Sequence, residues 1–429
     1  MGTFMPISDY PSVLEIKDPL HGYIELSSVE KSILDLRLTQ RLRNIRGPAG
    51  IHLVFPGADT SVMGRLLGVM HVTKVFFDSL DGDLDEVQRA RLVAMLLTLS
   101  TGPWNNVMTE YLTVRGTNKQ KLAGLIAAKS PVKDIIKDSV TSVNEIKNML
   151  ERGVPLKSFR LDLTKCPINP VLIDNLERDA YFAGVEYAQL EYRRLFAATR
   201  IAKNKIALNR SSMYTFEAYL SAGVNMYDAV YYHRTVRAAE LMLLRILDEA
   251  GSQLFLSPDD DIEQFLLYDD LSFLDILISV NEDSTDEMQT ASRLYKDFRK
   301  RYLIKLASER AISDVAFMKK ISTPDGLFQV ESEIAEAADI DPRNVYIDYP
   351  DRPSLVYYPG KYPLDELVFF ERGSKGYEFW PVDEVSLIAR SFNRDLRPVR
   401  VYTTRGYRSK VKKAGDKLLE SVDVPGSIA

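Results

Sequence analysis

The sequence has few of the side chains that form cross-links or bind transition metals. Its 429 residues include one cysteine, Cys166, and only four histidines, at positions 21, 52, 71 and 233. A single cysteine excludes an internal disulfide framework and is typical of a reducing compartment, so we expect a cytoplasmic protein. Zinc or iron needs three or four converging ligands, and these histidines are widely spaced in the sequence. We therefore predict no metal and no other cofactor.

Long apolar runs and phosphate-loop motifs are also absent. No segment approaches the roughly 18 apolar residues that span a membrane, and the N-terminus lacks the pattern of a signal peptide. We therefore expect no membrane partner. Neither GxxxxGK[ST] nor GxGxxG occurs, which excludes a standard phosphate-binding loop. The net charge of −5 argues against a protein that coats nucleic acid through bulk charge.

The pattern of apolar residues predicts a mainly α protein. Helical periodicity dominates from about residue 27 to 320, with helices expected at 85–99, 237–250, 265–278 and 291–306. After about residue 325, short segments rich in Val, Tyr, Phe and Ile alternate with Pro and Gly. These predict strands at 344–348, 354–358, 366–371 and 398–402, with helices at 331–338 and 383–392. We expect a helical core at residues 1–325 and a smaller α+β unit at 326–429.

Seven motifs occur in order along the chain and carry a family resemblance. They are KDPLHGYIEL at 17–26, QRLRNIR at 40–46, VFPGA at 54–58, LGVMH at 67–71, DNLERDAYFAGV at 174–185, VYYHRTVRAAE at 230–240 and RVY at 400–402. This series resembles HD-domain phosphohydrolases of the deoxynucleoside-triphosphate triphosphohydrolase type. The resemblance implies an HD-domain-like helical core, whose relatives use a metal to hydrolyse nucleotides.

The same resemblance implies that the metal ligands are missing. The stretch LVAMLLTLSTGPWNNV at 92–107 is similar to the family's metal-binding helix, but the His-Asp pair falls on Leu97 and Thr98. The first histidine falls on Arg65, and the distant aspartate falls on Val171. Only Thr98 offers an oxygen, and the charge of Arg65 would repel a metal ion. We therefore assign no catalytic residue and predict a degenerate family member that acts in binding, regulation or scaffolding.

An anion or nucleotide pocket is a further hypothesis at this site. Several other positions match the family's motifs: Asp174, Arg178, Asp179, Tyr231, His233 and Arg234. Arg65 could pair with Asp174 or Asp179, or it could hold the phosphate of a ligand. The simpler interpretation is a salt bridge that fills an inactive pocket. An active nucleotide phosphohydrolase with a rearranged site is the alternative to a degenerate protein.

A basic stretch near the C-terminus provides a candidate surface. Residues 394–417 contain nine Lys or Arg residues against two Asp residues, with Tyr402 and Tyr407 interleaved. The basic residues singled out are Arg400, Arg405, Arg408, Lys410, Lys412 and Lys413. Such a stretch could bind nucleic acid, since cations neutralise phosphates and aromatic rings stack on bases. A solvated face or an assembly surface is the simpler interpretation. The resemblance favours a homo-oligomer, and a catalytic paralogue is another partner that it allows.

Overall fold

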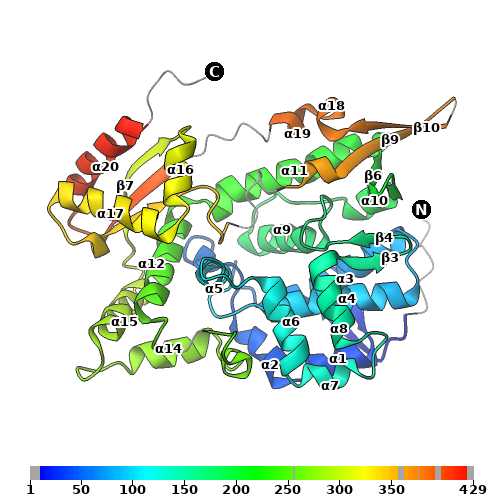
Figure 1. Ribbon diagram of the computed structural model, residues 1–429, viewed down its shortest axis with the longest axis horizontal. Coiled ribbons are helices and arrows are strands. Elements are labelled where there is room, and N and C mark those ends of the chain that lie inside the picture. The colour runs from blue at the N-terminus through cyan, green and yellow to red at the C-terminus, as the bar shows by residue number, and fades with distance from the viewer. Residues whose placement is uncertain (1–9, 255–256, 356–361, 375, 392–397, 423–429) are drawn as a thin grey trace.

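The computed structural model describes residues 10–254, 257–355, 362–374, 376–391 and 398–422 (Figure 1). Helices dominate these residues, and the strands form four small sheets. The predicted mainly α architecture with a smaller α+β C-terminal unit is therefore confirmed. None of the helices in these ranges is long and apolar enough to cross a membrane.

The first half of the chain forms a helical body with two small hairpins. Its elements are β1 Leu14–Asp18, β2 Gly22–Leu26, α1 Ser28–Leu34, α2 Arg37–Gln40, α3 Val62–Ser79, α4 Leu84–Leu99, α5 Asn106–Thr113, α6 Lys119–Lys129, α7 Val132–Ile136, α8 Val143–Arg152, β3 Val154–Leu156, β4 Phe159–Leu161 and α9 Pro170–Ala183. Local sequence sets the helix starts, because Asp83 caps α4 in a capping box and Asn169 caps α9 ahead of Pro170.

The second half continues this body and adds the C-terminal unit. Its elements are α10 Tyr192–Ala197, β5 Thr199–Ala202, β6 Lys205–Asn209, α11 Met213–Met226, a π-helical turn Tyr227–Tyr231, α12 Arg234–Ala250, α13 Ile262–Phe265, α14 Asp270–Ile278, α15 Asp286–Arg299, β7 Lys305–Ala311, α16 Val315–Ile321, α17 Pro324–Ala338, β8 Val345–Asp348, β9 Leu367–Gly373, β10 Gly376–Pro381, α18 Val382–Val385, α19 Leu387–Ser391, β11 Pro398–Thr403 and α20 Arg408–Val422.

Two hydrophobic cores hold these elements. The larger core runs through the helical body, where α3 packs against α4 and α9. The smaller core lies among α16, α17, α20 and the sheet β7-β11-β8, which Figure 1 shows in yellow to red. The segment with β9 and β10 joins the helical body, because β9 pairs in parallel with β6. The boundary at 325/326 stays a sequence prediction.

Three of the expected helices differ from the structure. The helix expected at 383–392 is divided at Ser386 into α18 and α19, and residue 392 lies outside the described residues. The helix expected at 291–306 was wrong at its end, because α15 stops at Arg299 and Arg301 has a positive φ of 56°. Lys305 and Leu306 instead begin β7, where pairing with β11 outweighs the helical pattern. The helix expected at 265–278 is interrupted, because Asp269 caps a new helix, α14. The strand expected at 354–358 lies mostly outside the described residues.

Candidate functional site

A cavity of about 530 Å³ lies where α3, α4, α5, α6, α9 and α12 meet. Its wall includes the four positions that the resemblance aligns with metal ligands: Arg65, Leu97, Thr98 and Val171. They come from α3, the last turn of α4 and the first turn of α9. The structure therefore brings together four residues that are up to 106 positions apart in sequence. The positions that the resemblance aligns with metal ligands thus lie around one cavity.

Arg65 is held by partners on α9. Its Nη2 atom donates to Oδ1 of Asp179 at 2.7 Å, and its Nη1 atom donates to the side-chain oxygen of Asn175. Tyr231, in the π-helical turn, donates its hydroxyl to Oδ2 of Asp179 at 2.8 Å. Both charged side chains are buried. Of the two partners expected for Arg65, the structure shows Asp179.

Asp174 belongs to a different cluster, which joins the N-terminal hairpin to α9. Its carboxylate binds Nε2 of His21 at 2.7 Å and Nη2 of Arg178 at 2.8 Å, and Arg178 also reaches Asp18 at 3.0 Å. Burial raises the pKa of Asp174, but the charge of Arg178 and the hydrogen bonds from His21 and Arg178 bring it below its ordinary value. Gly68 allows this packing, since a Cβ there would overlap Asp174 and Arg178. The cluster is outside the cavity wall.

The remaining candidates of the predicted pocket are also outside the wall. His233 caps α12, accepting a hydrogen bond from the backbone N–H of Thr235, and its ring meets Phe55 edge to face. Burial and the charges of Arg234 and Arg400 lower the pKa of His233. Arg234 is exposed. Of the seven residues expected in the pocket, only Arg65 and Tyr231 line the cavity.

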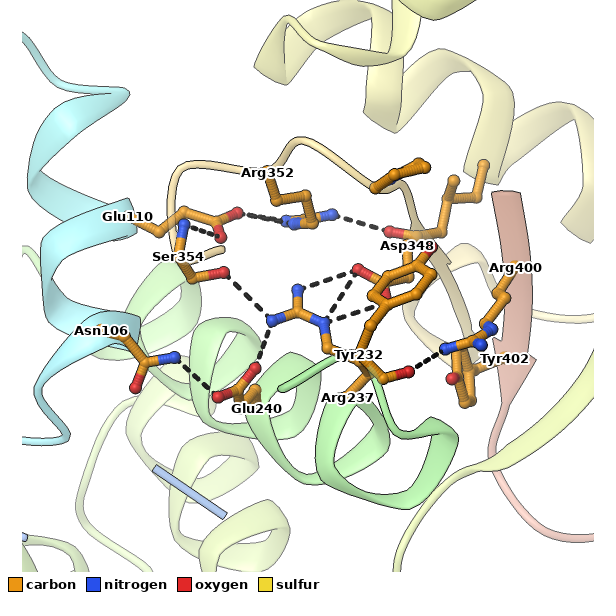
Figure 2. Close-up of polar contacts among 12 residues, drawn as sticks. Asn106, Glu110, Tyr232, Arg237, Glu240, Asp348, Arg352, Ser354, Arg400 and Tyr402 are labelled. Atoms are coloured by element: carbon orange, nitrogen blue, oxygen red, sulfur yellow. Dashed lines mark hydrogen bonds and ion pairs between the residues drawn. The ribbon is translucent and has the colours of Figure 1, made fainter. Parts of the chain in front are cut away.

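A buried ionic network connects another part of the wall to the C-terminal unit (Figure 2). Arg237 of α12 binds Asp348 of β8 at 2.8 Å and also pairs with Glu240. Arg352 binds Glu110 of α5 at 2.6 Å. Three carboxylates thus face two guanidinium groups, because Glu110, Glu240 and Asp348 share the two arginines. The network carries one negative charge too many when all five groups are ionised.

Glu240 is the member of this network that lines the cavity. Its Oε1 atom accepts a hydrogen bond of 2.6 Å from Asn106, whose own oxygen accepts from the backbone N–H of Ala49. Burial raises the pKa of Glu240 to about 7, with Asp348 and Glu110 adding to the effect and Arg237 opposing it. Glu240 is the last residue of the motif at 230–240, but the sequence alone did not predict that it lines the cavity.

Lys119 is a second cavity residue that the sequence did not reveal. It is the first residue of α6 and is partly buried. Burial, reinforced by the charge of Arg65, lowers the pKa of Lys119 to about 8. Its neighbours in sequence, Asn118 and Gln120, are ordinary helix-start residues, so no motif marks it.

Comparison with known proteins now identifies the family. The HD-associated region is matched by residues 190–424, which is more than half of the chain. The chain belongs to this family. Its HD-associated region contains Tyr231, the Arg237–Asp348 pair and the three-stranded sheet, so one side of the cavity and most of the ionic network are built from it. Membership in the HD superfamily, expected from the motifs, is thereby supported.

Individual relatives carry either no function in their names or a nucleotide phosphohydrolase name. The uncharacterized protein YwfO of Bacillus subtilis is 28% identical over 243 residues, covering 54% of this chain and 55% of that protein. A deoxynucleoside triphosphate triphosphohydrolase SAMHD1 homolog of Dictyostelium discoideum is 21% identical, covering 78% of this chain and 68% of that protein. The chain spans little more than half the length of YwfO and 58% of the similar protein MJ1154 of Methanocaldococcus jannaschii.

Two solved structures share the fold. A hypothetical protein from Aquifex aeolicus superposes with a TM-score of 0.70 at 23% identity, covering 94% of this chain and 99% of that one. A phosphohydrolase from Bacteroides thetaiotaomicron gives 0.68 at 18% identity, with 91% and 100% covered. The arrangement of the HD-associated region relative to the helical body is thus shared beyond this chain.

The basic stretch is divided by the fold of the HD-associated region. Arg400 lies against Tyr232 and pairs with Glu309, Lys410 pairs with Asp339, and Lys412 pairs with Asp416. Arg405 instead stacks on Tyr302 at 3.7 Å and gathers with Arg408, Arg301 and Lys305. Burial and these three guanidinium groups lower the pKa of Lys305. We call Arg301, Lys305, Arg405 and Arg408 the basic cluster.

Proposed function

We propose that this protein is a degenerate HD-family member that binds a small phosphate-containing ligand in the cavity and does not hydrolyse nucleotides through a metal. The observation that carries the proposal is the convergence of Arg65, Leu97, Thr98 and Val171 on one cavity wall. The binding role that we assign is regulatory or scaffolding, alone or beside a catalytic paralogue. The names of the relatives support a nucleotide or a related phosphate compound as the ligand.

The donor set at these positions does not fit a divalent metal. Leu97 and Val171 have no donor atom, and the hydroxyl of Thr98 donates to the carbonyl oxygen of Ala94 at 3.0 Å. Arg65 adds a positive charge where a metal would need negative ligands. Across the described ranges, no three His, Cys, Asp or Glu side chains gather in a way that could hold a metal ion.

The cavity is nevertheless suited to binding a ligand. Its volume of about 530 Å³ falls within the range of small-molecule sites, and its wall combines apolar side chains with polar and charged ones. A pocket that had merely collapsed around the Arg65–Asp179 pair would leave no such space. Arg65 is therefore part of the wall, and its ion pair with Asp179 does not fill the cavity.

The experiment is a hydrolysis assay on the full chain. Purified protein is incubated with dATP, dGTP, GTP and a phosphodiester, each with Mg²⁺, Mn²⁺, Ni²⁺ or Co²⁺. We expect no turnover above that of the matched variant Tyr231→Phe, which keeps the cavity wall and removes one hydroxyl. If the wild type hydrolyses a substrate and Tyr231→Phe or Thr98→Val lowers that turnover, the cavity contains a rearranged hydrolytic site. That result would overturn the proposal.

A second candidate function uses the basic cluster. Arg405 and Arg408 lie beside Arg301 and Lys305, and the half-exposed Tyr302 adds an aromatic face. This arrangement favours a phosphate-rich partner such as nucleic acid. Filter binding of an oligonucleotide at two salt concentrations tests it. We expect affinity to fall with salt and to weaken in Arg405→Gln/Arg408→Gln but not in Lys410→Gln/Lys412→Gln. If affinity does not respond to salt, the cluster is a solvated or assembly surface, such as that of a homo-oligomer.

A further inference from the structure

Two cations of the described residues line the cavity, and they differ in whether a protein group already neutralises them. Arg65 is committed to Asp179 and Asn175, which hold its guanidinium group from α9. Lys119 faces the same cavity, and no hydrogen bond or ion pair links its ammonium to any residue that the structure describes. Lys119 is partly buried, and without a carboxylate partner its ammonium needs water to accept its hydrogen bonds or an anionic ligand to balance its charge. Among the residues that the structure describes, Lys119 is therefore the available positive charge of the cavity.

The other charged side chains of the wall are carboxylates. Glu240 and Asp351 line the cavity together with Lys119 and Arg65. Around them the wall is neutral and polar, with hydroxyl and amide groups, and it includes four tyrosines. These neutral polar residues are Thr98, Thr101, Asn105, Asn106, Thr109, Thr113, Asn118, Gln120, Thr164, Asn169, Asn175, Ser354, Tyr219, Tyr227, Tyr231 and Tyr362. Such a wall suits a ligand that has one anionic group attached to an uncharged polar or aromatic body.

We propose that the cavity binds a phosphomonoester and discriminates against triphosphates, with Lys119 as the residue that binds the phosphate. This inference depends on the proposed function, because it specifies the ligand of that same cavity. A sugar phosphate and a nucleoside monophosphate share the required chemistry.

Charge decides between a monophosphate and a triphosphate. A phosphomonoester carries about 1.5 to 2 negative charges at neutral pH, most of which the free ammonium of Lys119 can balance. A triphosphate adds further charge, and proteins usually compensate it with Mg²⁺ held by carboxylates. At the positions that the resemblance aligns with metal ligands, this chain has Arg65, Leu97, Thr98 and Val171, which provide no carboxylate for such an ion. The carboxylates of Glu240 and Asp351 lie on the same wall and repel additional phosphates.

Isothermal titration calorimetry of the full chain in metal-free buffer tests the proposal. The probes are dAMP, ribose 5-phosphate, inorganic phosphate and dATP. We expect at least one of the two phosphomonoesters to bind, and dATP to bind about tenfold more weakly than dAMP or not at all. The arms with dAMP and ribose 5-phosphate show whether the ligand body is a nucleoside or a sugar.

Two lysines of α6 provide a matched pair of variants. Lys119→Met removes the cavity ammonium, and we expect phosphomonoester affinity to fall about tenfold or more, as for loss of a charge-assisted hydrogen bond. Lys121→Met removes an exposed lysine that pairs with Asp259, and we expect no change in affinity. Circular dichroism and thermal unfolding check that both variants fold.

The outcomes separate this inference from the proposed function. Binding of dATP as tight as that of dAMP overturns the discrimination against triphosphates, and equal binding by wild type and Lys119→Met overturns the role of Lys119. Either result leaves a non-hydrolytic binding protein. Failure of both phosphomonoesters to bind at millimolar concentration overturns the inference as well. Metal-dependent turnover in the hydrolysis assay would overturn the proposed function itself, whatever the calorimeter shows.

Discussion

The Nη2 atom of Arg65 lies 2.7 Å from Oδ1 of Asp179, and both side chains are almost completely buried. This contact joins α3 to α9 at the wall of the cavity. Tyr231 and Asn175 complete the polar partners of the pair. A cation is thus fixed at a position where relatives are expected to hold a metal ligand, and it is balanced from within the protein.

The first prediction concerns the stability that this pair provides. Arg65→Met leaves the carboxylate of Asp179 buried without its counter-charge, and we expect the free energy of unfolding to fall by about 3 kcal/mol. Adding Asp179→Asn removes the unpaired buried carboxylate. The double variant should therefore lose less free energy of unfolding than the two single variants lose in total. Urea denaturation of the four proteins gives the coupling energy.

An exposed pair serves as the control for this measurement. Nζ of Lys31 on α1 lies 2.7 Å from Oδ2 of Asp35, the C-cap residue of that helix, and about half of each side chain is exposed. Lys31→Met should change the free energy of unfolding by less than about 0.5 kcal/mol. A similar small change for Arg65→Met would show that the buried pair does not hold α3 to α9.

The second prediction concerns pH and Glu240. Because burial raises its pKa in the folded protein from 4.5 to about 7, the folded state holds this proton more tightly than the unfolded chain does. The stability from this group is fully present below about pH 4.5 and is lost as the pH rises through 7. Between pH 6 and 8 we expect its loss to lower the free energy of unfolding by about 1 kcal/mol.

Urea denaturation of wild type and Glu240→Gln at both pH values checks this effect. The variant lacks the titrating group, so its loss of stability between pH 6 and 8 should be smaller than that of wild type. The exposed Glu191→Gln should behave like wild type, since Glu191 lies on the surface beside Arg194. Parallel pH profiles for wild type and Glu240→Gln would show that Glu240 is ionised throughout.

The sequence predicted more of the fold than of the site. Ordered motifs and helical periodicity were sufficient for the helical body and the α+β unit. They failed at Lys305 and Leu306, because strand pairing with β11 is a long-range interaction that a local pattern does not contain. The break at Asp269 was readable in principle, because an aspartate followed three residues later by Ser272 can cap a helix.

The site was predictable where alignment to a motif placed a residue, and elsewhere it was not. Arg65, Leu97, Thr98 and Val171 were named from the sequence, and all four line one cavity. Lys119 was missed because its role depends on burial and on the absence of a carboxylate partner among the described residues, and neither property has a sequence signature.

The third prediction concerns the pH dependence of ligand binding. Lys119 binds a phosphate only when protonated, and its pKa is about 8, so affinity should fall as the pH rises from 7 to 9. Within the described part of the wall, the other charged groups are Arg65, Glu240 and Asp351. Below pH 6 the phosphomonoester itself takes up a proton, since its second pKa is about 6, and affinity should fall there too. Calorimetry with dAMP measures the affinity across this range. In Lys119→Met the fall in affinity between pH 7 and 9 should be absent.

The fourth prediction concerns restoration of a metal site. The variant Arg65→His/Leu97→His/Thr98→Asp/Val171→Asp places two imidazoles and two carboxylates on the wall where the four native residues already converge. We expect it to retain Mn²⁺ or Ni²⁺ after dialysis. The triple variant without Val171→Asp should retain less. Equal retention by wild type and the fourfold variant would show that these positions do not form the site.

The metal content of the native protein shows directly whether the cavity holds a metal ion. The full chain is equilibrated with Mn²⁺, Ni²⁺ or Fe²⁺, passed through a desalting column and analysed by inductively coupled plasma mass spectrometry. We predict far less than one ion per chain, because Arg65, Leu97 and Val171 offer no ligand to a cation. One tightly bound ion per chain, lost in Thr98→Val or Asp179→Asn, would contradict it and place a metal centre in the cavity.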